Sequence, residues 1–118
     1  MLGFPKSVRL KGDKAFGLLL LRGKRKTFPG GEIFWRENDL KISRFGLRVS
    51  SSAGIAVLRT AIRRRVREMV RKNQILFRPG RDYLVVIKNK NLFPTLPDNK
   101  MADYLFSLFG PDVLERVS

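Results

Sequence analysis

The chain has 118 residues, 43% of them hydrophobic, which suits one domain over residues 1–118 with a single core. Its 25 Lys and Arg against 10 Asp and Glu leave a net charge of +15, a self-repelling surplus that a polyanion such as nucleic acid would neutralise. Cysteine and histidine are both absent, which excludes disulfides, thiolate chemistry and the usual transition-metal ligands.

The first predicted element is a helix over residues 10–23. Phe16, Leu19 and Leu20 recur at the i, i+3 and i+4 positions of one face, and Gly23 is a natural stop. The apolar run inside it, AFGLLLL, is far shorter than the roughly 20 residues of a transmembrane helix, and no small-residue cleavage site follows it. We therefore expect a cytoplasmic protein with no membrane partner.

Two strands are predicted next, after the breaker-rich connection KTFPGG. Residues 32–37 alternate in character, with Ile33 and Trp35 on one face and Phe34 on the other, and a turn follows them. Residues 44–50 also alternate, with these three side chains pointing inward: Phe45, Leu47 and Val49. On the opposite face of this second strand lie Gly46 and Arg48.

The second half of the chain predicts a long basic helix, a third strand and a final helix. The basic helix runs from about Ile55 or Val57 to Lys72, and residues 82–88 form a near-continuous apolar strand that belongs in the centre of a sheet. A final helix covers residues 99–110, and the tail over 111–118 is expected to be loosely held. This order predicts an α+β fold in which strands pair around a crossover helix.

The basic helix has two distinct sides. Its apolar side chains form one stripe of the width expected of a helix packed on a sheet: Leu58, Ile62, Val66, Met69 and Val70. Arginines at successive i+4 positions follow the edge of this stripe and form what we call the arginine ridge: Arg59, Arg63, Arg67 and Arg71. Beside the ridge lies Arg64, and on the other flank lie Arg65 and Lys72.

The ridge favours a structured nucleic-acid partner. Like charges at i and i+4 destabilise a helix by roughly 0.2–0.5 kcal/mol each, and a merely solvated face would normally alternate its signs. Guanidinium groups grip phosphate bidentately and stack on bases. Charge alone leaves several alternatives open: a ribosomal or other structural RNA-binding protein, a protein-only nuclease, and a DNA-binding domain. The DNA alternative lacks evident base-reading side chains near the start of the helix.

The stretch GIAVLRTAIRRRVREMVR, residues 54–71, resembles the signature of the bacterial ribonuclease P protein subunit. In that signature an Arg-Asn-Arg-x-Lys-Arg block continues into an Arg-Glu pair. Thr60 and Ala61 depart from the pattern, standing where the family typically has Asn and Arg, and Ser51 and Ser52 stand where it often has a lysine pair. The likeness extends over roughly residues 5–109.

The resemblance implies a fold, a function and partners. The fold would be a sandwich like ribosomal protein S5 domain 2, with a small central sheet, a basic crossover helix, and N- and C-terminal helices. The protein would join a catalytic RNA subunit and assist endonucleolytic removal of the 5′ leader from precursor tRNA, with no DNA partner. In the family the basic helix meets the RNA subunit, so the implied RNA-binding residues are Arg59, Thr60, Arg63, Arg64, Arg65, Arg67 and Arg71.

The family also holds the single-stranded leader in a cleft between the basic helix and the sheet. By position, Phe16, Leu20 and Phe34 match the residues that line it, and Arg48 is a further candidate. Single strands bind to aromatic platforms beside positive charge, at about 1–3 kcal/mol per stacked base. Phe34 lies on the strand face opposite Ile33 and Trp35, as an exposed platform requires, so we expect it to be exposed. The alternative is that Phe16 and Phe34 are ordinary core residues.

No catalytic or metal-ligating residue is predicted in this chain. Phosphodiester hydrolysis needs a general base or a metal-held hydroxide, and protein nucleases usually supply clustered carboxylates or histidines. Here histidine is absent and the 10 carboxylates are scattered. We therefore expect no cofactor bound by the protein alone, and Mg²⁺ held through the RNA subunit.

Overall fold

The computed structural model describes residue 10, residues 12–89 and residues 98–115. Within these ranges the elements follow in the order α1 (Asp13–Arg22), β1 (Lys24–Phe28), β2 (Gly31–Glu37), β3 (Arg44–Val49), η2 (Ser51–Ala53), α2 (Ala56–Lys72), η3 (Gln74–Leu76), β4 (Arg81–Ile87) and α3 (Asp98–Phe109), where η marks a short 3-10 helix. The predicted α+β class is confirmed, and the predicted helices and strands all occur within a few residues of their expected bounds.

The strands form one mixed sheet in the order β1-β2-β4-β3. The β1–β2 and β2–β4 pairs are antiparallel, and the β3–β4 pair is parallel. A parallel pair needs a crossover connection, and α2 lies in the segment that supplies it between β3 and β4. The basic helix is therefore the crossover helix, and β4 has the central position expected of its apolar sequence.

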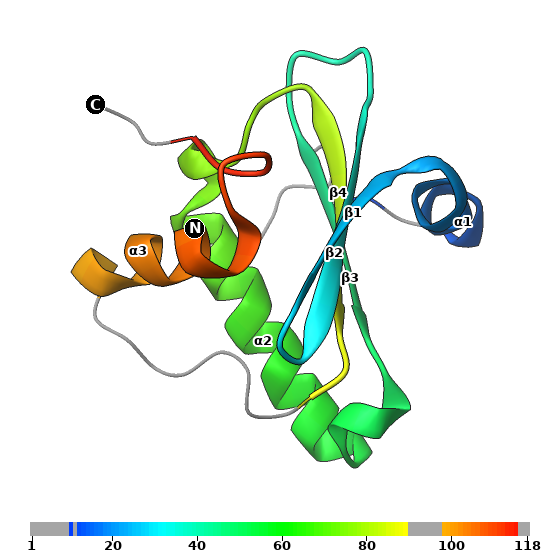
Figure 1. Cartoon of the computed structure of the whole chain (residues 1–118). Helices are drawn as coiled ribbons and strands as arrows, with labels where there is room; N and C mark the ends of the chain where they lie inside the picture. Colours follow the sequence, from blue (N-terminus) through cyan, green and yellow to red (C-terminus); the bar gives the residue numbers. More distant parts are fainter. Residues whose placement is uncertain (1–9, 11, 90–97, 116–118) are drawn as a thin grey trace.

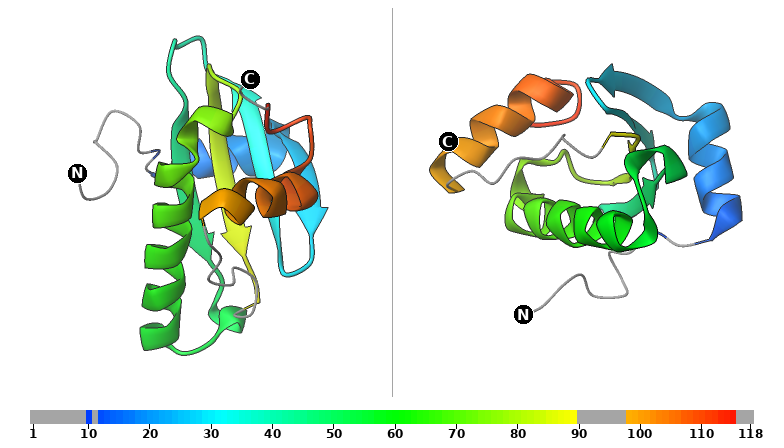
Figure 2. Two further views of the ribbon diagram at one scale, coloured as in Figure 1. Left: turned by 90° about the vertical axis from the view of Figure 1, so that its left-hand side faces the viewer. Right: turned by 90° about the horizontal axis from the view of Figure 1, so that it is seen from below.

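Helices cover both faces of this sheet. Figure 1 shows α1 on one side and both α2 and α3 on the other, and the turned views of Figure 2 agree. The larger core lies between the sheet and the pair α2 and α3, around side chains such as Ile33, Tyr83 and Leu105. A smaller core lies under α1 and contains Leu10, Leu19, Phe34, Leu84 and Val86.

Tyr83 marks the centre of the larger core. Its ring stacks on Phe45 with 5.4 Å between centroids and meets Phe77 edge-on at 5.2 Å. Its hydroxyl donates a hydrogen bond of 2.6 Å to the carbonyl of Arg78, so the buried phenol has a partner. Burial raises the pKa of Tyr83 to about 12.

The first strand, β1, was not predicted, because the residues before 32 were interpreted as a breaker-rich connection. Pro29 and Gly30 turn the chain, Gly30 adopts a φ of 92°, and Phe28 then lies opposite Gly31 in register. This strand has no apolar alternation because it is an edge strand whose Lys24 faces solvent. Charged edge positions discourage further strand pairing, so a charge-rich sequence here is compatible with a strand.

The C-terminal segment also differs from its prediction, because residues 111–115 are firmly packed. Val113 and Leu114 are 0% exposed. The amide of Arg78 donates to the carbonyl of Val113 at 3.1 Å, and the amide of Glu115 donates to that of Leu76 at 2.7 Å. The expectation of a loosely held tail is therefore wrong for 111–115, and residues 116–118 lie outside the described residues.

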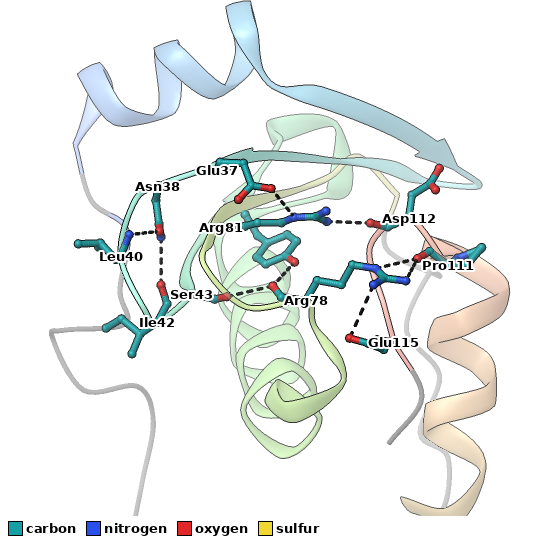
Figure 3. Close-up of polar contacts among 11 residues, drawn as sticks. Glu37, Asn38, Leu40, Ile42, Ser43, Arg78, Arg81, Pro111, Asp112 and Glu115 are labelled. Carbon is teal, nitrogen blue, oxygen red and sulfur yellow. Dashed lines mark hydrogen bonds and ion pairs between the residues drawn. The ribbon is translucent and has the colours of Figure 1, made fainter. Parts of the chain in front are cut away.

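Two arginines secure the same segment through its carbonyl groups (Figure 3). The Arg78 guanidinium donates to the Pro111 carbonyl at 2.9 and 3.0 Å, and Arg81 donates to the Asp112 carbonyl at 2.8 Å. Arg78 also lies 3.6 Å from the Glu115 carboxylate. Part of the cationic surplus is therefore used within the fold, where it ties residues 111–115 to β4 and to the turn before it.

Candidate nucleic-acid interface

The apolar stripe of α2 packs as its spacing predicts. Ile62, Val66, Met69 and Val70 are buried, and Leu58 is half-buried against the larger core. Burial of this stripe fixes the rotation of the helix on the sheet, because the apolar side chains must face the core. The arginines are therefore directed to its margins and its outer surface.

Two members of the arginine ridge have partners within the fold. Nε of Arg59 donates to the carbonyl of Gly54 at 3.1 Å, which ties this side chain to the turn that precedes α2. Arg71 forms a two-pronged ion pair with Glu68, and Nε lies 3.0 Å from Oε2. The hydrogen bond from Arg71 lowers the pKa of Glu68, and the charge of Lys72 adds to this effect.

Three other arginines of α2 are uncommitted. Arg63 is half-buried, Arg64 and Arg67 are exposed, and within the described residues none of the three makes a hydrogen bond or ion pair. Arg65 is exposed on the other flank. Thr60 is exposed, and its hydroxyl donates to the carbonyl of Ala56 at 3.1 Å, which leaves its oxygen as an acceptor. The outer surface of α2 thus offers several guanidinium donors.

A cavity of about 300 Å³ lies along the outer edge of β3. We call it the β3 cavity. One wall comes from α2, with Val66, Val70 and the charged Arg67, and another from the start of α1, with Phe16. Because β3 is an edge strand, side chains from both faces of the sheet reach the same opening. An aromatic ring and a guanidinium beside one hollow are the features that single-stranded nucleic acid uses.

The structure does not bring together all four residues predicted for the cleft. Phe16 lines the β3 cavity, but Leu20, Phe34 and Arg48 do not. Leu20 is 39% exposed on α1. Arg48 is also exposed, and it lies on the sheet face against which α1 packs. The expectation that Phe34 is an exposed platform is wrong, because this side chain is 6% exposed in the small core beneath α1.

Sequence reasoning missed most of the apolar lining of the β3 cavity. Phe45 and Leu47 of β3 line it although both belong to the inward face of the strand. Gly46 was the available signal, because glycine within a strand often marks close approach by another group. Here that group is the ring of Phe16: a Cβ on Gly46 would lie 2.7 Å from its Cε1 atom.

Replacing Gly46 with Ala is expected to displace the ring of Phe16 from its seat on β3. Because stacking on an aromatic side chain contributes about 1–3 kcal/mol per base, affinity for a single-stranded RNA oligonucleotide should fall by roughly 5- to 150-fold. Gly17→Ala is the matched control, since a Cβ there meets nothing within 4 Å. The control should stabilise α1 by about 1 kcal/mol and leave RNA affinity unchanged. Equal affinities for both variants would rule out Phe16 as a stacking platform.

Among the described residues no group of three or more acidic side chains is placed to hold a metal ion. This finding does not test whether the protein alone binds a metal, so the expectation that it binds none remains a prediction. In the same residues no helix is both long and apolar enough to cross a bilayer.

Comparisons with known proteins agree with the fold and with the motif on α2. The sequence profile of the family described as Ribonuclease P matches residues 4–109. The ribonuclease P protein component of Syntrophus aciditrophicus is 32% identical over 87 residues, which cover 74% of this chain and 73% of that protein. The corresponding protein of Dictyoglomus turgidum is 26% identical over 106 residues, covering 90% of this chain and 89% of that one.

Solved structures give the same result. The RNase P protein from Thermotoga maritima is similar with a TM-score of 0.71 and 26% identity, covering 86% of this chain and 94% of that chain. The RNase P protein of Staphylococcus aureus has the same fold, with a TM-score of 0.70, 22% identity and coverage of 87% and 93%.

Proposed function

This chain belongs to the ribonuclease P protein family, the protein subunit of the endoribonuclease that removes the 5′ leader from precursor tRNA, and we propose that two of its surfaces divide the RNA between them. The outer surface of α2 binds the RNA subunit. The β3 cavity receives the leader. The observation that carries this proposal is the set of uncommitted arginines on a helix whose opposite side is fixed in the core.

The charge balance of α2 supports the first half. Arg63 and Arg67 stand four residues apart between Arg59 and Arg71, and the helix contains one acidic residue, Glu68, already paired with Arg71. Such a helix repels itself until phosphates neutralise it. Each phosphate contact also releases condensed counterions, which gives affinity for a folded RNA without base reading.

The geometry of the β3 cavity supports the second half. Arg67 is at its rim and Phe16 at its wall, so a backbone phosphate and a base of the same strand find partners a short distance apart. A volume of about 300 Å³ is at the lower end of the range for ligand pockets. We therefore expect one base of the leader to enter, with its neighbours on the surface.

We propose that the chemistry belongs to the RNA. In the described part of the chain no acidic cluster could hold Mg²⁺, and histidine is absent from the whole sequence. RNA phosphates would then hold Mg²⁺, which activates the attacking water when bound. The protein would reduce phosphate repulsion and orient the leader, so the assembly should need less divalent ion. The processing of tRNA precursors and the lack of cysteine both favour the cytoplasm as the compartment of this protein.

Reconstitution with a bacterial ribonuclease P RNA tests this function. At a Mg²⁺ concentration too low for the RNA alone, adding the protein is expected to restore leader removal from precursor tRNA. The protein alone, after nuclease treatment, should cleave nothing. Cleavage by RNA-free protein would overturn the proposed division of labour. RNA recovered with the protein from cells should be enriched in ribonuclease P RNA, and enrichment in ribosomal RNA would favour the alternative of a ribosomal or structural RNA-binding protein.

A further inference from the structure

A second basic hollow lies at the corner of the sheet where α1 ends and β1 begins. This corner cavity has a volume of about 340 Å³ and is lined from α1, β1, β2, β4 and the turn after β2, and its lining includes the buried Trp35. Four cations line it, Arg22, Lys24, Arg36 and Arg81, against the two carboxylates of Glu37 and Asp39, so the lining carries a charge of 4 − 2 = +2.

Among the described residues, three of the four cations make no hydrogen bond or ion pair. Arg81 has partners, because it donates to the carbonyl of Asp112 at 2.8 Å and lies 3.5 Å from the Glu37 carboxylate, as Figure 3 shows. Arg22, Lys24 and Arg36 are exposed, and each lacks a hydrogen bond or ion pair with any residue that the structure describes. The cavity therefore contains one arginine that is held by the fold and three cationic side chains that are available to a ligand.

The backbone holds these cations close together. Lys24 lies opposite Trp35 in the β1–β2 register, and Arg36 follows directly in β2. Gly23 joins α1 to β1 in a turn so close that a Cβ on it would lie 2.6 Å from the carbonyl oxygen of Leu19 and 3.1 Å from that of Trp35. Arg22 is thereby held beside the end of β2. The three side chains therefore line one cavity from positions in α1, β1 and β2 rather than from a flexible loop.

The corner cavity is separate from the interface on α2. In the order β1-β2-β4-β3, the first strand is three positions from β3, or about 14 Å at roughly 4.8 Å per strand. α1 lies on the opposite face of the sheet from α2 (Figure 1). No residue that lines the corner cavity belongs to α2 or lines the β3 cavity, so a phosphate there would be held by side chains other than those of the arginine ridge.

We propose that the corner cavity is a second binding site for the RNA phosphate backbone, held by Arg22, Lys24 and Arg36. This inference rests on the proposed RNA-binding function but concerns a different surface. Two guanidinium groups can each offer a pair of donors to phosphate oxygens, and the ammonium adds a point charge. The phosphate could come from the RNA subunit or from the precursor tRNA, because their backbones share this chemistry.

The test compares two double variants of equal net charge in the full chain. Arg22→Gln/Arg36→Gln removes the guanidinium groups of the corner cavity. Lys14→Gln/Lys100→Gln is the control, since both lysines are exposed and lack hydrogen bonds or ion pairs among the described residues. The first measurement is the salt dependence of binding between each variant and ribonuclease P RNA. The second is the salt dependence of binding between precursor tRNA and the complex assembled from that RNA and each variant. Thermal unfolding confirms that each variant is folded.

The corner variant is expected to lower the slope of log affinity against log salt by about 1.4–1.8, or 0.7–0.9 per phosphate contact, while the control leaves it unchanged. A fall with the RNA subunit assigns the phosphate to that RNA, and a fall only with precursor tRNA assigns it to the substrate. No fall in either measurement, or an equal fall in the control, overturns the proposal. Arg63→Ala/Arg67→Ala run in parallel separates this failure from a failure of RNA binding as such.

Discussion

Replacing Arg63 and Arg67 together with Ala is expected to weaken binding to ribonuclease P RNA by about a hundredfold and to stabilise the free protein. A hydrogen bond to a charged group contributes about 1.5 kcal/mol or more, which is roughly tenfold in affinity for each arginine. The gain in stability has a separate cause. Both side chains stand in the i, i+4 series of the arginine ridge, and their removal ends three repulsive steps of about 0.2–0.5 kcal/mol each.

The opposite signs of these two effects make the experiment decisive. The slope of log affinity against log salt should fall by about 1.4–1.8, and the urea midpoint of the free protein should rise at constant slope. Lys14→Ala/Lys100→Ala removes the same charge from exposed positions elsewhere and should change neither quantity appreciably. If affinity is retained, the outer surface of α2 is not the contact surface. If stability falls, these arginines have partners within the fold.

The parts of the fold that the sequence predicts well are those with a strong apolar period. The stripe on α2 and the alternation around Ile33 and Trp35 each specify a buried face, and the structure buries both. The run in β4 is apolar on both faces because helices cover both sides of the central strand. In these segments local spacing and tertiary burial favour the same arrangement.

The misses have a common physical cause, because each depends on a contact with another element that the local sequence pattern does not specify. β1 is a strand through pairing with β2, and its charged sequence has no period of its own. The face of Phe34 was predicted correctly, but its burial depends on where α1 packs, which periodicity does not specify. The β3 cavity likewise needs α1, β3 and α2 together, and of the four residues predicted for the cleft only Phe16 lines it.

The C-terminal segment is the same kind of miss, and it carries the largest expected effect on stability. In sequence this segment gives only weak signals, because it follows the break at Gly110 and Pro111 and contains few apolar side chains. In the fold, Leu114 pairs with Phe77 in an antiparallel bridge and is 0% exposed. Val113 is buried beside it in the larger core. This packing holds the segment that follows α3 against the larger core.

Replacing Leu114 with Ala is therefore expected to lower the free energy of unfolding by about 2–5 kcal/mol, through lost burial and the cavity that remains. Asp112→Ala is the matched control, because its backbone carbonyl still accepts from Arg81 and its side chain is exposed. The control should change stability by less than about 0.5 kcal/mol. Urea unfolding gives both values. A loss as small as that of the control would mean that the segment is not packed in solution, and Arg78 and Arg81 would then be free to join the RNA-binding surface.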